Sequence, residues 1–501
     1  MEETHLRSEG ADDALDRLLA TTCDDLVVAS NRQPYRHTYD DGAVDVDRPA
    51  GGLTAGLDAV MRRIDGTWVA WGDGDADAAV VDGDDRVSVP PEGDDYTLQR
   101  LWLSEDEVDG YYYRISNRVL WPVCHAALAT VDSCRDAWSD YRRVNDRFAD
   151  AVAADADGDD LVWLQDYHLA LASRLVRERS TDEPVVAQSW HIPWPSWDTF
   201  RACPHREELL RGLLGNDLLG FHVPRYCENF LESVEAGLPD AEVDAETGRV
   251  RYDGATTTVR AFPMGVPVDR IREQADSDEA VGFWAAFRKN RDIDPDTRVA
   301  VGVDRLDYTK GIPQRLDALE HLLAERPRWR GEFTYVQVGT ESRSDIPAYR
   351  RCQERVAERV EAINDRFGTD DHQPVVYTTE MLSNEALAGL YRNADLAVVS
   401  PVRDGMNLVA QEYVAASVDG DSALLLSDQA GAHDELGQWA VTVSPNDTTG
   451  FARAIDEALT MADDERRRRM DALRAYVADN DIESWIRDVF GSIQSLQAAE
   501  V

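Results

Sequence analysis

Short apolar runs alternate with helical patterns along the whole chain, and this alternation limits the fold more than any other sequence feature. Each run is short and apolar and is followed by polar, glycine or proline residues, as in strands buried within parallel sheets. The runs fall into two blocks. The first comprises residues 26–30, 161–164, 185–190, 218–221 and 259–262. The second comprises residues 298–303, 333–338, 375–377, 396–400, 423–426 and 440–443.

Helical patterns, such as residues 313–324 and 349–367, separate these runs. The pattern predicts an α/β fold of two doubly wound, Rossmann-like domains. Two prolines and a glycine in residues 263–269 are typical of a linker between them. We expect an N-terminal extension over residues 1–23, a first domain over 24–264 and a second over 265–480. Ligands of such folds bind at the carboxyl ends of strands, which predicts a site in the cleft between the blocks.

The chain is strongly acidic. It has 96 acidic and 52 basic residues and a net charge of −44, which disfavours a nucleic-acid partner. Lys289 and Lys310 are the only lysines, and every other basic residue is arginine. An acidic, lysine-poor surface is typical of proteins adapted to high salt, where ions screen self-repulsion. We interpret most aspartate runs, including residues 73–77 and 82–85, as solvated surface and not as metal sites.

The sequence also bears on compartment and partners. No apolar stretch reaches the roughly 18 residues of a membrane span, and the N-terminus lacks the basic and apolar regions of a secretory signal. We therefore expect a cytoplasmic protein without a membrane partner, and the oligomeric state stays open, a homo-oligomer included. Six scattered cysteines without CxxC spacing predict buried thiols, and neither a disulfide framework nor a zinc site.

Several familiar catalytic signatures are absent. The chain has no GxxxxGK[ST] phosphate loop and no GxGxxG following a strand. It also has neither GxSxG nor HExxH. These absences disfavour P-loop nucleotidases, dinucleotide-binding enzymes, common serine hydrolases and zinc proteases.

Polar residues cluster instead at the ends of second-block strands. Arg305 and Lys310 follow the strand 298–303, and two fixed cations on one loop suit a diphosphate, above all as it departs. Residues 401–409 follow the strand 396–400 and open a helix, whose first N–H groups form an anion site. Glu412 lies inside this helix, where a carboxylate can accept a hydrogen bond from a ribose hydroxyl.

The first block has a comparable set. Asp166 and His168 follow the strand 161–164, and His191 follows the strand 185–190, so these side chains could grip sugar hydroxyls. The aromatic run 111–122, with Trp68 and Trp71, could build a platform for a sugar ring. For each of these aromatic residues, an ordinary place in the core is an equal alternative.

In this order and spacing, the motifs resemble the trehalose-6-phosphate synthases, glycosyltransferase family 20. The resemblance extends from about Asp25 to Trp485. The matching segments are residues 30–32 (Ser-Asn-Arg), 51–53 (Gly-Gly-Leu), 119–122 (Val-Leu-Trp-Pro), 166–168 (Asp-Tyr-His), 191–193 (His-Ile-Pro), 305–311 (Arg-Leu-Asp-Tyr-Thr-Lys-Gly), 403–409 (Arg-Asp-Gly-Met-Asn-Leu-Val) and 479–481 (Asp-Asn-Asp).

The resemblance implies the glycosyltransferase-B fold, with the last helix, residues 481–501, crossing back to the first domain. It implies no metal and no cofactor. Donor-binding roles, for the diphosphate, its support and the ribose, pass to Arg305, Lys310, Gly52, Asn407, Leu408, Val409 and Glu412. Roles at the donor glucose pass to Asp166, His191 and Asp404. Acceptor-binding roles, with the arginines holding a 6-phosphate, pass to Arg32, Trp71, Tyr112, Trp121 and Arg343.

By the same resemblance, glucose moves from a nucleotide-glucose to glucose 6-phosphate with retention of configuration. Attack comes from the front face, and the departing phosphate takes the acceptor proton. The product is α,α-trehalose 6-phosphate. UDP-glucose is the donor we expect, while GDP, ADP and TDP stay open. Gln165, Trp194 and Gln411 depart from the family pattern of His, Phe and Lys, which leaves the sugar fit and the nucleobase less determined.

Three alternatives stay open. The same fold could use another acceptor phosphate, such as glycerol 3-phosphate. A non-catalytic sugar-phosphate sensor would be expected to lose donor residues, whereas Arg305, Lys310, Asp404 and Glu412 are all present. A pyridoxal-phosphate phosphorylase of similar architecture would need a cofactor lysine, and only Lys289 and Lys310 are available.

Overall fold

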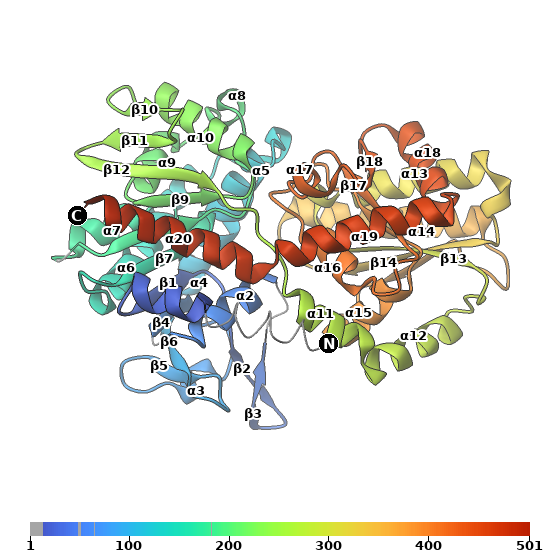
Figure 1. The fold of residues 1–501 in the computed structure, drawn as a ribbon, viewed down its shortest axis with the longest axis horizontal. Coiled ribbons are helices and arrows are strands. Elements are labelled where there is room, and N and C mark those ends of the chain that lie inside the picture. The colour runs from blue at the N-terminus through green and yellow to red at the C-terminus, as the bar shows by residue number, and fades with distance from the viewer. Residues whose placement is uncertain (1–13, 49–51, 65, 182, 501) are drawn as a thin grey trace. The chain divides into compact units, whose positions relative to one another are not determined.

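The computed structural model describes residues 14–48, 52–64, 66–181 and 183–500, and its chain divides into two compact units (Figure 1). Unit 1 comprises Met1–Pro263 and Glu483–Val501, and unit 2 comprises Met264–Ile482. Of the expected N-terminal extension, residues 1–13 lie outside the described residues. Residues 14–22 are helical, and the side chains of Gln494 and Gln497 donate hydrogen bonds to Thr21 and Thr22.

Unit 1 is built on a ten-stranded sheet with the order β10-β11-β12-β9-β8-β7-β1-β4-β6-β5. Its strands from β12 to β6 in this order are all parallel, and antiparallel strands close both edges. The strands are β1 (Leu26–Ser30), β4 (Gly66–Trp71), β5 (Arg86–Val89), β6 (Tyr96–Leu101), β7 (Leu161–Gln165), β8 (Val185–Ser189), β9 (Leu218–Phe221), β10 (Glu242–Asp244), β11 (Arg249–Tyr252) and β12 (Ala255–Ala261). The order reverses at β1, as in doubly wound folds.

The C-terminal helix α20 (Ile482–Glu500) packs within unit 1 (Figure 1). The ring of Trp485 lies 5.3 Å from that of Trp163 on the central strand β7. Phe490 meets Trp163 edge to face at 5.5 Å. The helix thereby covers the apolar middle of the sheet, and residues far apart in sequence share one core.

Unit 2 is a six-stranded, fully parallel sheet with the order β15-β14-β13-β16-β17-β18. Alternate residues of one strand enter separate apolar clusters: Val299 and Val301 belong to one, and Ala300 to the other. Both faces are therefore buried, which explains why these strands are continuous apolar runs in the sequence. The strands are β13 (Arg298–Arg305), β14 (Phe333–Thr340), β15 (Val375–Thr378), β16 (Leu396–Val399), β17 (Ala423–Ser427) and β18 (Val441–Val443).

Helices cover both faces of this sheet. The cluster containing Val299 also takes residues from α11 (Val268–Asp276), α15 (Asn384–Asn393), α16 (Val409–Ala416) and α19 (Asp463–Asp479). The cluster containing Ala300 takes residues from α13 (Ile312–Glu325), α14 (Pro347–Phe367) and α18 (Thr448–Leu459). The expected helices over residues 313–324 and 349–367 are confirmed as α13 and α14.

Every predicted strand is present, to within a few residues at its ends, but seven of the strands in the described residues were missed. Those in the main sheet of unit 1 are β4, β5, β6, β10 and β11, and the hairpin of β2 (Arg36–Asp40) and β3 (Ala43–Asp47) forms a second sheet. Strand β6 alternates buried and half-buried residues, so it lacks the continuous apolar run that marks a central strand. The aromatic run is helical: a π-helix, η1 (Val108–Leu120), continues into α5 (Trp121–Cys124).

Two further expectations have clear outcomes. The six cysteines all lie among the described residues, where they are buried and form no disulfide, as predicted. The assignment of residues 73–77 to solvated surface is wrong for Asp77, which is fully buried beside Arg100.

Within the described residues, no helix is long and apolar enough to cross a membrane. No group of three or more His, Cys, Asp or Glu side chains in this part of the chain could hold a metal ion.

Candidate active site

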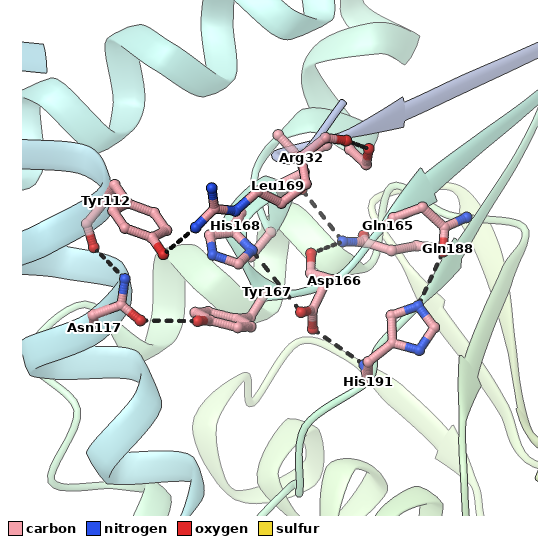
Figure 2. A network of polar contacts seen from close by, with 12 residues as sticks. Arg32, Tyr112, Asn117, Gln165, Asp166, Tyr167, His168, Leu169, Gln188 and His191 are labelled. Atoms are coloured by element: carbon pink, nitrogen blue, oxygen red, sulfur yellow. Dashed lines mark hydrogen bonds and ion pairs between the residues drawn. The ribbon is translucent and has the colours of Figure 1, made fainter. Parts of the chain in front are cut away.

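In unit 1, Asp166 and His191 follow the adjacent parallel strands β7 and β8 and lie side by side (Figure 2). The backbone N–H of His191 donates to Asp166 Oδ1 at 3.2 Å. Asp166 has a φ of +67°, and its own N–H donates to the Ser189 carbonyl at 2.7 Å, which fixes this left-handed turn. Non-glycine residues in this region of φ are rare and mark functional turns.

Two side chains contact the His191 ring. Its Nε2 lies 3.0 Å from the Gln165 side-chain oxygen, and its Nδ1 lies 3.2 Å from His222 Nε2. Burial lowers the pKa of His191 well below its ordinary value, and the neighbouring His222 lowers it further. The imidazole is therefore uncharged at neutral pH, and both of its ring nitrogens face these two partners. Gln165, a departure from the family pattern, thus contacts a predicted site residue directly.

Arg32, at the end of β1, lies against an aromatic group (Figure 2). Its Nη2 donates to the Tyr112 hydroxyl at 3.0 Å, and its guanidinium lies 5.5 Å from the centre of that ring. The Tyr112 ring stacks on His168 at 5.9 Å, and Trp71 lies 6.0 Å away. The structure therefore brings three predicted acceptor residues together from β1, β4 and η1.

Asn117, which sequence reasoning did not single out, fastens the π-helix to the strand end. Its side-chain nitrogen donates to the Tyr112 carbonyl at 2.8 Å, and its oxygen accepts from the Tyr167 hydroxyl at 3.1 Å. Trp121 reaches the same group, with its ring 6.0 Å from that of Tyr167. Trp68 does not: it is buried, and its Nε1 donates to Ser30 Oγ at 2.9 Å, so it belongs to the core.

In unit 2, Lys310 and Asp404 meet across adjacent strand ends. Lys310 Nζ lies 2.5 Å from Asp404 Oδ2, and both side chains are largely buried. The Asn407 side chain donates to the same carboxylate oxygen at 2.9 Å, and the Gly405 N–H donates to the other oxygen at 2.9 Å. These donors fix the Asp404 carboxylate, which in turn holds the ammonium in one place.

The two loops that carry this pair are joined through the backbone. Val402 N–H donates to the Thr309 carbonyl at 2.8 Å. Gly311 has a φ of +69°, and a Cβ built on it would lie 2.0 Å from the Ser400 carbonyl oxygen. Only glycine fits this close approach, so the turn after Lys310 depends on Gly311.

A buried arginine supports these loops from below. Arg315, on α13, is fully buried; its Nη1 donates to Asp304 Oδ2 at 2.9 Å and to the Tyr335 hydroxyl at 2.8 Å. Its Nε donates to Ser400 Oγ at 2.9 Å. Burial raises the pKa of Asp304, and the charge of Arg315 opposes this rise. One guanidinium therefore links the carboxyl ends of β13 and β16 and the Tyr335 side chain of β14.

Arg305 and Arg343 lie near the same edge of this sheet. Arg305 is the last residue of β13 and not part of the following loop, and it pairs in register with Thr340 at the end of β14. Arg343 follows three residues later with a φ of +53°. Its Nη1 donates to the Tyr349 hydroxyl at 2.6 Å, and it lies 4.0 Å from Asp307 Oδ2. Three predicted cations, Lys310 included, thus lie at or just after the ends of β13 and β14.

The predicted ribose and backbone residues lie at helix starts. Helix α16 begins at Val409 with Leu408 as its N-cap, and Asn407 before it has a φ of +77°. Glu412 lies in its first turn, and the Tyr391 hydroxyl donates to its Oε2 at 3.4 Å. Burial raises the pKa of Glu412. Gly52 is the first residue of α2 (Gly52–Met61), and Gly51 lies outside the described residues.

The other two departures from the family pattern serve packing. Trp194 is fully buried, and its Nε1 donates to Ser233 Oγ at 3.0 Å. Gln411 is buried on α16, and its side chain donates to the Met264 carbonyl at 3.0 Å. Neither substitution touches a predicted phosphate cation within the described contacts.

A hollow of about 670 Å³ in unit 1 lies away from all these residues. Arginines of α6 (Trp138–Asp155), α7 (Ala172–Arg179) and α9 (Arg206–Leu213) surround it. They are already paired with carboxylates, as Arg142 is with Glu208 and Arg174 with Glu178. We therefore assign the chemistry to the strand ends and not to this hollow.

Comparisons with known proteins identify the family of the chain. The sequence model of glycosyltransferase family 20 matches residues 24–495. A bifunctional trehalose-6-phosphate synthase/phosphatase of Thermoproteus tenax is 35% identical over 485 residues, or 95% of this chain. The chain spans 64% of that relative's length.

Solved structures also match nearly the whole chain. A trehalose-6-phosphate structure from Escherichia coli, bound with UDP-2-fluoro glucose, has a TM-score of 0.83 at 31% identity and covers 94% of this chain and 99% of its own. A UDP-forming α,α-trehalose-phosphate synthase from Burkholderia xenovorans, in complex with glucose 6-phosphate, has a TM-score of 0.82 at 29% identity, covering 94% and 100%. The predicted glycosyltransferase-B fold class is confirmed, and the chain belongs to glycosyltransferase family 20.

Proposed function

We propose that this chain transfers glucose from UDP-glucose to glucose 6-phosphate, giving α,α-trehalose 6-phosphate and UDP with retention of configuration. The observation that carries the proposal is the Lys310 ammonium, held 2.5 Å from Asp404 at the carboxyl ends of β13 and β16. A cation fixed in this way is suited to charge that develops on a departing phosphate. The identity of the two substrates comes from the names of the relatives, and the charges and aromatic rings of the predicted site residues explain how such substrates would bind.

On the donor side, Lys310 and Arg305 take the diphosphate. The start of α16, with Asn407, Leu408 and Val409, adds N–H groups that point toward an anion. Glu412, one turn further, takes the ribose hydroxyls. Gly52 supports the diphosphate from the start of α2.

The sugar of the donor is held by hydrogen bonds. Asp166, His191 and Asp404 are assigned to the hydroxyls of the transferred glucose. The uncharged His191 ring adds no second cation beside the sugar. Asp404 accepts from Lys310, Asn407 and Gly405, so it is held rigidly whatever it contacts in the complex.

On the acceptor side, Arg32 and Arg343 take the 6-phosphate, because a guanidinium matches phosphate geometry. Trp71, Tyr112 and Trp121 pack on the sugar ring. This aromatic group favours a hexose phosphate over a small acceptor such as glycerol 3-phosphate. A sensor that only binds sugar phosphates would have no need for the fixed Lys310–Asp404 pair.

The reaction balances without a metal, a cofactor or a covalent intermediate. The bond between the anomeric carbon and the diphosphate breaks, and a bond to O1 of glucose 6-phosphate forms. The proton of that hydroxyl goes to the departing phosphate oxygen, and Lys310 and Arg305 stabilise the charge that remains. We place the reaction in the cytoplasm, because six cysteines without a disulfide suit reducing conditions.

The test is nucleoside diphosphate release in molar salt, with each of the UDP, GDP, ADP and TDP glucoses in turn. We expect release that depends on glucose 6-phosphate and is fastest with UDP-glucose. Glycerol 3-phosphate is the comparison acceptor. Release that depends on glycerol 3-phosphate instead, or binding of glucose 6-phosphate without any turnover, would contradict the proposal.

A further inference from the structure

We propose that Asp73 and Gln33 are positioning residues for the acceptor arginine Arg32, and that the buried ion pair Arg100–Asp77 anchors them. The proposal deepens the function proposed above and rests on it, because that function assigns Arg32 to the 6-phosphate. None of these four residues is among the predicted site residues.

The anchor is an ion pair inside unit 1. Asp77 and Arg100 expose 0% and 1% of their surface, and Arg100 Nη2 lies 3.2 Å from Asp77 Oδ1. The backbone N–H groups of His37 and Gly74 each donate to Asp77 at 2.8 Å. Burial alone would raise the pKa of Asp77, but its hydrogen bonds, those from His37 and Gln33 foremost, outweigh burial and lower it. Both members of the pair are therefore charged and fixed.

Gln33 joins this pair to the surface. Its side-chain oxygen accepts from Arg100 Nε at 2.9 Å, and its nitrogen donates to Asp77 Oδ2 at 2.6 Å and to Asp73 Oδ1 at 2.7 Å. A guanidinium only donates and a carboxylate only accepts, so the three bonds leave one orientation for the amide. Gln33 exposes 1% of its surface and follows Arg32 directly in the chain.

Asp73 connects the fixed Gln33 side chain to Arg32. One carboxylate oxygen accepts from Gln33, and the other accepts from Arg32 Nη1 at 3.3 Å. The second guanidinium nitrogen, Nη2, donates a hydrogen bond to the Tyr112 hydroxyl at 3.0 Å. The Arg32 side chain is 55% exposed, whereas that of Asp73 is 17% exposed. An arginine so open to solvent commonly samples many rotamers, and contacts of this kind restrict it before the phosphate arrives.

The turn that carries Asp73 is built closely around the anchor. A Cβ on Gly74 would lie 2.3 Å from the His37 carbonyl oxygen and 2.8 Å from Asp77 Oδ1. The turn between β4 and α3 (Asp77–Val80) is therefore seated on β2 and on the buried carboxylate. Asp73 is thus fixed by contacts to the buried interior of unit 1, whereas an ordinary surface ion pair has no such support.

The substitution Asp73→Asn isolates this role. It keeps the shape of a partly exposed side chain, but an amide cannot accept from Arg32 and Gln33 through both of its atoms. Losing one charge-assisted hydrogen bond predicts a KM for glucose 6-phosphate raised about tenfold. The removed carboxylate also repels a phosphate, so a lowered KM would show that repulsion and not positioning dominates, and would overturn the proposal.

The experiment compares Asp73→Asn, Arg32→Gln and the double variant, with Asp84→Asn as the matched control in an exposed turn of unit 1. We expect Asp73→Asn to raise the KM for glucose 6-phosphate while the KM for UDP-glucose and kcat stay within about twofold. The double variant should equal Arg32→Gln alone, because Asp73 acts through Arg32. Additive losses, or equal rises in both KM values, would overturn the proposal.

A crystal structure of Asp73→Asn gives a readout that needs no substrate. We expect the Arg32 guanidinium to leave the Tyr112 hydroxyl, and an unchanged Arg32 would overturn the positioning role. The two proposals fail separately. A wild-type protein without turnover on glucose 6-phosphate contradicts the proposed function alone, whereas an active wild type with an unaffected Asp73→Asn contradicts only this inference.

Discussion

Replacing Lys310 by methionine should abolish most of the activity while leaving the chain folded. The substitution keeps the length and apolar stem of the side chain and removes only the ammonium. That group lies 2.5 Å from Asp404 Oδ2, and its side chain is 13% exposed, so water cannot take its place freely. It is therefore a preorganised cation, whose stabilisation of developing charge is realised without reorganisation.

The expected magnitude follows from this geometry. Losing one preorganised donor at a developing charge typically lowers kcat by about 10² to 10³, or roughly 2.7 to 4 kcal/mol. The folded state loses less, because Gly405 and Asn407 still donate to Asp404. Leaving this carboxylate without its charged partner costs about 1 to 3 kcal/mol. The melting temperature of the variant should therefore fall by only several degrees.

The assay is UDP release in molar salt, with saturating glucose 6-phosphate and varied UDP-glucose. Lys289→Met is the matched control, since Lys289 is the only other lysine and lies exposed at the end of α12 (Asp278–Asn290) in the same unit. The control should retain full activity. If Lys310→Met turns over within about threefold of the control, fixed-cation stabilisation of the departing diphosphate is refuted.

Four more perturbations follow from the same contacts. Arg343→Ala should raise the KM for glucose 6-phosphate at least about tenfold and spare that for UDP-glucose, and a selective loss of donor affinity would contradict its role. Arg315→Met leaves Asp304 buried without its cation, so thermal unfolding should reveal a loss of about 3 to 5 kcal/mol, which Asp304→Asn in the same chain should partly restore. Below about pH 6.5 the unfolded chain protonates His191 and the native chain does not, so the free energy of unfolding should decrease as the pH is lowered. The variant His191→Gln should show a smaller decrease over the same pH range. Raising KCl from about 0.1 to 2 M should raise the melting temperature, and an unchanged or lower value would refute adaptation to salt.

The central strands were predictable from the sequence because a strand that is buried on both faces needs apolar residues at nearly every position. Strands β13 and β16 are of this kind. Arg305 was singled out because it follows the predicted strand 298–303, whereas the role of Asp404, on the loop after β16, came from the resemblance to the family. Strand β6 lies next to the sheet edge and alternates in burial, so its pattern is weaker and it was missed.

Pairs that join distant segments were not predictable. Asp77 occurs in an acidic run that resembles solvated surface, and only the fold brings Arg100 against it. Lys310 was singled out because lysine is rare in this chain, but nothing in the sequence indicates that it pairs with Asp404. Such contacts depend on which strand ends are adjacent, and a single sequence does not carry that information.

The most direct test of the central claim is UDP release from UDP-glucose, measured in molar salt with and without glucose 6-phosphate. We predict release that requires the acceptor, together with a disaccharide phosphate that phosphatase converts to α,α-trehalose. Folded protein that releases no UDP when both substrates are present, or that releases it equally without glucose 6-phosphate, would contradict the account.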